Sequence, residues 1–121
     1  MTAESDQIKR AARNQSLFRE VNERLQDIAN SFQSVSSTAV FSCECAALSC
    51  TEQIEMSMDE YEVVRSQPNG FAVLPGHVYP DVENVVRENE RFVVVAKIGP
   101  GAKIAKETYP RASAASSTRR A

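Results

Sequence analysis

The chain has 121 residues and a net charge of −2, so a single domain is the expected organisation. Residues 34–99 carry a net charge of −6 and residues 100–121 carry +4. The acidic middle region repels phosphate, so nucleic acid is an unfavourable partner and only the basic end could contact it. The longest apolar run, residues 92–96, is far shorter than the roughly 20 residues that a membrane helix needs, so no membrane association is expected.

Residues 5–33 are predicted to form a helix. Its apolar residues follow each other at spacings of three and four, which places them in one stripe on a helix: Phe18, Val21, Leu25, Ile28 and Phe32. The stripe covers about two heptads, fewer than the three or four that identify a coiled coil. Two interpretations therefore stay open. The stripe packs on the protein's own core, or it is the contact surface for a protein partner or a homodimer.

A break rich in small polar residues, 34–38, follows this helix. Residues 39–45 and 51–56 are then predicted to be two strands of a hairpin, with Cys50 in their connection. The next helix begins with Ser57-Met58-Asp59-Glu60, which is a capping box. That helix is expected to end near Ser66, because a proline follows at position 68.

The second half of the chain is predicted to be mainly β. Residues 71–74 form a strand, and Pro75-Gly76 fits the centre of a type II turn, directly before His77. Residues 82–87 and 92–98 are predicted to form a hairpin, although 82–86 also fits a short helix. The chain is expected to be irregular from Gly99, and residues 111–121 form a disordered tail.

All three cysteines lie within eight residues, as Cys43, Cys45 and Cys50, and His77 is the only histidine. A structural zinc site takes four thiolate and imidazole ligands, which is the whole cysteine and histidine content of this chain. Cys43 and Cys45 are two apart, so an extended strand projects both to one side. The region from residue 39 to about residue 99 has a small core, of the size that metals commonly stabilise. We therefore predict Zn²⁺ bound by Cys43, Cys45, Cys50 and His77, with iron as a less suitable metal.

Other interpretations of the cluster are redox chemistry without metal and three plain core thiols with a surface histidine. A Cys–His dyad is less favoured, because a filled metal site leaves His77 no role as a base. Glu44, Glu52 and Glu55 lie near the thiols and are interpreted as a charged surface, with Glu44 pointing away from its cysteine neighbours. The N-terminal sequence has no apolar segment typical of a secretory signal, which favours the cytoplasm, where thiols stay reduced.

The chain also resembles a family of small actinobacterial proteins of unassigned function. The resemblance covers most of residues 13–111 and depends on RNQSLFREVNERL, FSCEC with Cys50, IEMSMDEYEVVRSQP, FAVLPGH, and FVVVAKIG with KETYPR. The family is similar in carrying the three thiols and the histidine of the PGH motif. It implies a bacterial, cytoplasmic protein and no particular reaction.

These observations predict an α+β fold. A long helix (residues 1–38) precedes a small zinc-binding antiparallel β unit with one inserted helix (39–110) and a disordered tail (111–121). The predicted function is that of a non-catalytic protein-interaction or regulatory module. The alternatives are a zinc-thiolate redox sensor and a nucleic-acid-binding accessory protein.

Overall fold

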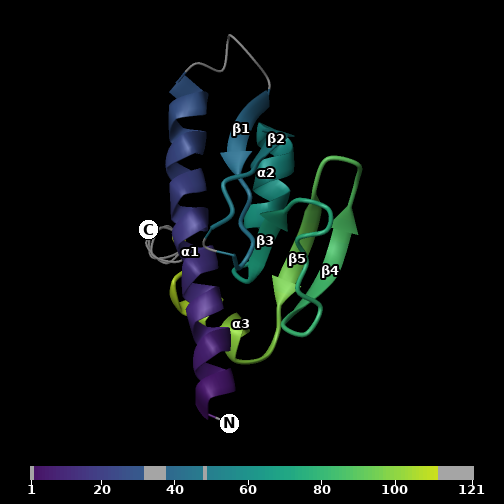
Figure 1. Cartoon of the computed structure of the whole chain (residues 1–121). Helices are drawn as coiled ribbons and strands as arrows, with labels where there is room; N and C mark the ends of the chain where they lie inside the picture. Colours follow the sequence, from purple (N-terminus) through teal and green to yellow (C-terminus); the bar gives the residue numbers. More distant parts are fainter. Residues whose placement is uncertain (1, 32–37, 48, 112–121) are drawn as a thin grey trace.

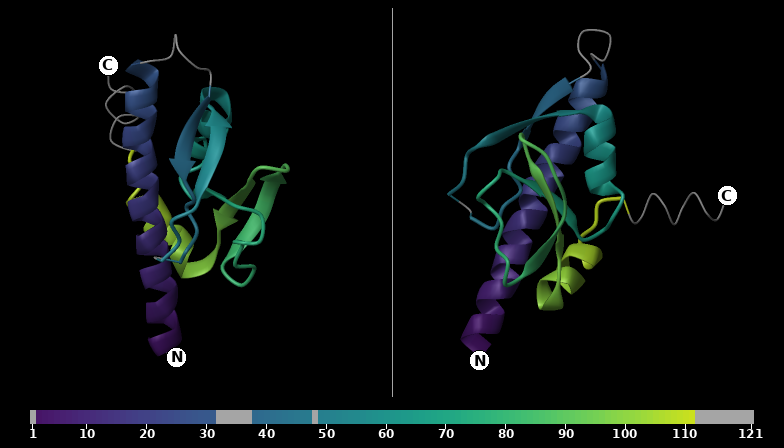
Figure 2. Two further views of the ribbon diagram at one scale, coloured as in Figure 1. Left: turned by 45° about the horizontal axis from the view of Figure 1, so that its top comes forward. Right: turned by 90° about the vertical axis from the view of Figure 1, so that its right-hand side faces the viewer.

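A computed structural model describes residues 2–31, 38–47 and 49–111 and has the predicted α+β architecture. A 30-residue helix, α1 (Thr2–Ser31), runs along one side of the molecule (Figure 1). Two small antiparallel sheets and two short helices lie beside it. The left-hand view in Figure 2 shows the same order, with the β4–β5 hairpin on the side away from α1.

The strands form two separate sheets. In the first, β1 (Thr38–Ser42) pairs with β2 (Gln53–Ser57). In the second, β5 (Val93–Lys97) lies between β3 (Gly70–Val73) and β4 (Glu83–Glu88). The amide of Glu44 donates to the carbonyl oxygen of Ala72 at 2.8 Å. This bond joins the segment that follows β1 to β3, and so connects the two sheets.

The helix between the sheets, α2 (Met58–Arg65), begins as the sequence predicts. The Glu60 amide donates to the Ser57 hydroxyl at 3.0 Å, and the Ser57 amide donates to the Glu60 carboxylate at 2.8 Å. Helix α2 packs on β2 and β3, and its Tyr61 ring stacks on Phe41 of β1 at 4.4 Å between centroids. The core around this pair is formed by Ile54, Met56, Val64, Phe71, Val73 and Phe92–Val95.

The structure corrects the prediction of irregular chain after Gly99, because residues Gly99–Glu107 form a third helix, α3. Gly99 has φ +64° and Pro100 is at the start of the helix, where proline is tolerated. Gly101 and Ala105 are buried and one turn apart, so they form a small-residue face against α1. A Cβ atom at position 101 would lie 3.5 Å from the Cβ atom of Ala12 on α1 and 2.9 Å from the end of the Lys97 side chain, which would have to shift.

Helix α1 contacts β1 and α3 mainly through polar side chains. The buried polar residues on this face are Gln15, Ser16, Arg19, Asn22 and Gln26. Arg19 donates to the carbonyl oxygens of Pro68 and Ala105 at 2.6 and 2.8 Å, and its guanidinium lies 4.7 Å from the centroid of the Phe71 ring. Burial and the neighbouring Arg65 lower the pKa of Arg19 to about 10.

The apolar stripe of α1 is only partly used in this packing. Leu25 is half-buried and packs against the core, and Phe18 is half-buried. Val21 and Ile28 are 47% and 58% exposed, and Phe32 lies outside the described residues. The core-packing interpretation therefore holds for part of the stripe, and its use by a partner stays a prediction.

The predicted tail begins with an anchored residue. Arg111 donates to the carboxylates of Glu23 on α1 and Glu62 on α2, both at 2.8 Å. The rest of the predicted tail, residues 112–121, lies outside the described residues, and the domain boundaries at 38 and 110 stay predictions. Among the described residues, no helix is long and apolar enough to cross a membrane.

Candidate metal centre

The structure brings all four predicted ligands together. One ligand atom from each of Cys43, Cys45, Cys50 and His77 lies within 4.8 Å of the other three. The cysteines belong to the connection between β1 and β2, whereas His77 is 27 residues beyond Cys50, after β3. The cluster therefore lies between the two sheets, close to the backbone bond from Glu44 to Ala72 that joins the segment after β1 to β3.

Two of the cysteines, Cys43 and Cys50, are positioned by backbone hydrogen bonds on either side of the hairpin connection. The Cys43 amide donates to the carbonyl oxygen of Glu52 at 3.0 Å, which continues the β1–β2 pairing by one step. The Cys50 amide donates to the carbonyl oxygen of Ala47 at 3.0 Å and closes a turn. This turn returns Cys50 to the side of Cys43 and Cys45.

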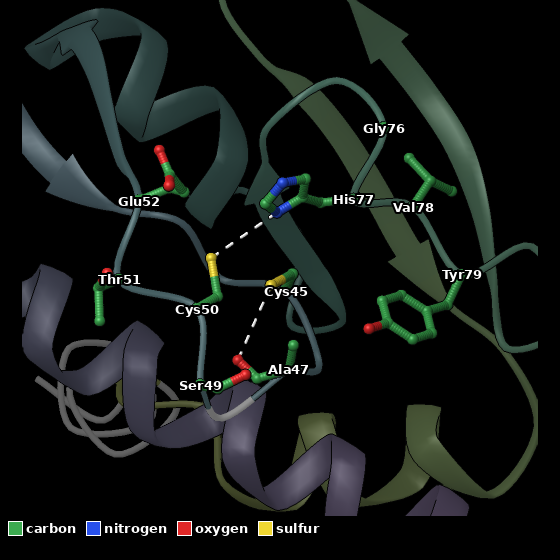
Figure 3. A pocket seen from close by; sticks show the side chains of 10 residues that line it. All are labelled: Cys45, Ala47, Ser49, Cys50, Thr51, Glu52, Gly76, His77, Val78 and Tyr79. Atoms are coloured by element: carbon green, nitrogen blue, oxygen red, sulfur yellow. Dashed lines mark hydrogen bonds between the residues drawn. The ribbon is translucent and has the colours of Figure 1, made fainter.

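A tight turn delivers the histidine. Gly76 has φ +89°, a backbone conformation that favours glycine, and the His77 amide donates to the carbonyl oxygen of Leu74 at 3.0 Å. Both observations agree with the type II turn predicted for Pro75-Gly76. The turn directs the His77 ring toward Cys50, as Figure 3 shows.

The distances suit a tetrahedral zinc ion. Zinc binds sulfur at about 2.3 Å and imidazole nitrogen at about 2.0 Å, so tetrahedral angles put these two ligand atoms roughly 3.5 Å apart. His77 Nδ1 lies 3.5 Å from Cys43 Sγ and 3.7 Å from Cys50 Sγ. Two sulfur ligands of one zinc ion would lie roughly 3.8 Å apart. No two of the four ligand atoms are more than 4.8 Å apart, so only small side-chain movements would bring the sulfur atoms to that distance.

Cys43 also has the hydrogen bond expected of a metal thiolate. The Leu74 amide donates to Cys43 Sγ at 3.3 Å, and such second contacts orient ligands and stabilise negative sulfur. Without a metal, burial raises the pKa of both Cys43 and Cys45. The site therefore disfavours bare thiolates and suits a dication, which supplies the positive charge that three buried sulfur ligands need.

A surface pocket of about 400 Å³ opens on one side of the cluster (Figure 3). Cys45, Cys50 and His77 line it together with exposed polar residues that include Ser49, Thr51 and Glu52. Cys43 does not line the pocket and is fully buried. Four protein ligands would complete a tetrahedral shell, which is the arrangement of structural zinc sites rather than catalytic ones.

The sequence interpretation of Glu44 as part of a charged surface is wrong. Glu44 points away from its cysteine neighbours, as alternation predicts, but this direction leads into the core, where its side chain is 0% exposed. Its carboxylate accepts two hydrogen bonds from Arg65, at 2.6 and 2.9 Å, and one from Asn22 at 2.7 Å. The amide of Ala72 donates a fourth at 2.9 Å.

Glu44 thus connects the metal ligands to the rest of the fold. Its side chain contacts α1, α2 and β3 through the four bonds above, and Gln15 of α1 donates to its carbonyl oxygen at 3.0 Å. The signal in the sequence was its position between two cysteines that share one face, because the intervening residue must then face the opposite side.

A second buried ion pair lies near the start of α3. Lys97 Nζ is 3.7 Å from Glu83 Oε1, and both side chains are fully buried. Gln15 and the Tyr79 amide also donate to the Glu83 carboxylate. Burial lowers the pKa of Lys97, although Glu83 opposes this effect. The pair lies where α1 meets β4 and β5, and Lys97 Nζ has no hydrogen-bond partner among the described residues.

Comparison with protein-family models, with curated proteins and with solved structures finds no match to this chain.

Proposed function

We propose that this protein is a small, non-catalytic zinc-binding protein that acts as a protein-interaction module. The observation that carries the metal assignment is the convergence of Cys43, Cys45, Cys50 and His77 within 4.8 Å, with nitrogen–sulfur distances that match a tetrahedral site. Zinc is favoured over other metals because it prefers a tetrahedral set of thiolate and imidazole ligands. The bound ion would fasten the hairpin connection to the turn that carries His77.

Elemental analysis of the purified protein tests the metal assignment. We expect one zinc ion per chain, and we expect the Cys45→Ser variant to lose both zinc and folded signal, since coordination energy acts as folding energy. Ser49→Ala is the matched control, because Ser49 lines the same pocket without a sulfur ligand. A well-folded protein without metal, prepared in the absence of chelators, would contradict the assignment.

The outer face of α1 supports the interaction role. Leu17, Val21 and Ile28 are 58%, 47% and 58% exposed, and spacings of four and seven residues place them on one face of the helix. This face lies opposite the buried polar face, so α1 directs mainly polar side chains inward and these three apolar side chains outward. Such an inverted arrangement is unusual for a surface helix, whose apolar stripe normally faces the core.

A second copy of this chain is the partner that the charges favour. In an antiparallel pair of α1 helices centred between residues 22 and 23, Leu17 of one copy faces Ile28 of the other. The same register brings Glu20 next to Arg24 of the second copy, so opposite charges meet. A parallel pair would instead place Glu20 of one copy and Arg24 of the other on opposite sides of the contact, so this charge pairing would be lost.

Sedimentation at several protein concentrations tests the second copy as partner. We expect a dimer that Ile28→Asp converts to monomer with the fold retained, whereas Val86→Asp, at a residue of β4 that is 62% exposed, leaves it intact. Glu20→Arg should weaken the dimer, and adding Arg24→Glu should restore it. A monomer at all concentrations would contradict this partner and leave a different protein as the occupant of the face.

A further inference from the structure

The cysteines of the cluster differ in their access to solvent. Cys43 is fully buried and Cys45 is 1% exposed, whereas Cys50 is half-buried. Cys50 and Cys45 line the 400 Å³ pocket and Cys43 does not. A small oxidant such as hydrogen peroxide that enters this pocket therefore meets the sulfur of Cys50 first and that of Cys45 next.

The backbone also pairs these two cysteines. Only four residues separate Cys45 from Cys50. The hydrogen bond from the Cys50 amide to the carbonyl oxygen of Ala47 closes a turn that brings the two cysteines to the same side of the hairpin connection. Two hydrogen bonds hold Cys43 in place. The Leu74 amide donates to its sulfur, and its own amide donates to the carbonyl oxygen of Glu52. The pair that can approach with least rearrangement is therefore Cys45 and Cys50.

We propose that the site responds to peroxide by forming a Cys45–Cys50 disulfide and releasing its metal. This inference depends on the proposed metal site. The Cys50 thiolate attacks one oxygen of hydrogen peroxide, the O–O bond breaks, and the products are a sulfenic acid and hydroxide, which takes a proton to become water. The Cys45 thiolate then attacks the sulfenic sulfur, the S–S bond forms, and a second hydroxide leaves and is protonated. Two thiolates lose two electrons, and peroxide is reduced to two water molecules.

Disulfide formation removes two of the four metal ligands. Cys43 and His77 remain, and two protein ligands are too few for a structural zinc site. The ion is released, and the hairpin connection is no longer fastened to the turn that carries His77. A thiol reductant would regenerate Cys45 and Cys50, so the change is reversible as long as oxidation stops at the disulfide.

The test begins with protein whose zinc content has been measured. A protein that binds no zinc is thereby distinguished from one whose bound zinc does not respond to peroxide. Peroxide is added in small molar excess, and a chromogenic zinc indicator follows release. We expect one equivalent of zinc to be released and to rebind after a thiol reductant is added. Zinc that stays bound under peroxide would overturn the proposal and leave the metal site intact.

Peptide mapping identifies the disulfide. A protease that cleaves after glutamate cuts at Glu44 and Glu52, which separates Cys43 from a peptide that contains both Cys45 and Cys50. We expect the mass of this peptide to fall by two hydrogens, because its disulfide is internal and joins it to no other peptide. A cross-link to the peptide that ends at Glu44 would assign the disulfide to Cys43 and overturn the proposed pair.

The variant Cys50→His tests which sulfur is attacked. Histidine offers a ligand atom in place of the accessible thiolate, and the zinc content of the variant is measured before peroxide is added. We expect peroxide to release zinc at least tenfold more slowly than from the parent protein. An unchanged rate in a zinc-loaded variant would show that Cys50 is not the first sulfur to react, contrary to the proposal.

Discussion

Replacing Glu44 with glutamine should destabilise the protein strongly, because the carboxylate is fully buried and already saturated with donors. Two of its four hydrogen bonds come from Arg65, whose side chain is also 0% exposed. Burial opposes the charge of Arg65, but Glu44, together with Tyr61 and Glu23, outweighs this effect and raises the pKa of Arg65. The Glu44→Gln variant would leave this guanidinium buried without a counter-charge and would place an amide donor among the remaining donors.

The expected loss is about 3–5 kcal/mol, the range found when one partner of a buried ion pair is removed. For a domain of this size such a loss lowers the melting temperature by at least about 10 °C. Urea unfolding followed by circular dichroism measures it, at a fixed excess of zinc because a ligand that binds the folded state also stabilises it. The exposed residue Glu52 provides the control, and Glu52→Gln should stay within about 0.5 kcal/mol of the parent.

A double variant separates the ion pair from general damage. With Glu44→Gln and Arg65→Met combined, no uncompensated charge remains, so the loss should be smaller than the sum of the two single losses. A loss below about 1 kcal/mol for Glu44→Gln alone would refute the reasoning. It would mean that water or a local rearrangement compensates Arg65 in the variant.

Three further changes test other parts of the fold. Ser57→Ala removes the capping hydroxyl of α2 and should cost about 1 kcal/mol in urea unfolding. Gly70→Ala should be more damaging, because the added methyl group would lie 2.8 Å from a backbone carbonyl oxygen of α2, and a shifted backbone should be visible as altered amide NMR signals in β3. For Glu23, burial is outweighed by hydrogen bonds from Arg111 and Tyr61, which lower its pKa, and Arg111 also lowers the pKa of Glu62. The stabilisation from these carboxylates is complete above pH about 4.5 and is lost as the pH falls below that value, so the stability difference between the parent and Arg111→Ala should shrink from pH 6 to pH 3.

The sequence predicted those parts of the fold whose cause is local. The capping box of Ser57 and Glu60, the turn before His77 and the β4–β5 hairpin depend on residues close together in the chain, and each is present. Helix α3 was missed because Gly99, Pro100 and Gly101 read as irregular chain. Its packing against α1 through small residues is a tertiary contact that no local pattern contains.

The orientation of α1 was also beyond the sequence pattern. Apolar periodicity favours the stripe with Val21 and Ile28 as the inner face, whereas the structure buries Gln15, Arg19 and Asn22. That choice depends on acceptors far along the chain, such as Glu44 for Asn22 and the Ala105 carbonyl for Arg19. The four candidate ligands were predictable because they are the only cysteines and histidine. Their unequal access to the pocket was not, because it depends on the turn and the strands around them.

The remote contacts of α1 have a consequence for how the chain is made. Arg19 bonds to a residue 86 positions later and Glu23 to one 88 positions later, so a ribosome synthesises this helix well before it synthesises α3 and Arg111, which help to hold it. At roughly 5–20 residues per second, that interval lasts about 4–18 s. An isolated helix with no packed face is only marginally stable in water, and both of its sides stay open to other nascent chains meanwhile. Docking of this helix on α3 is therefore a late step. Because the inner face of the helix is mainly polar, little apolar surface on that side is left uncovered until then.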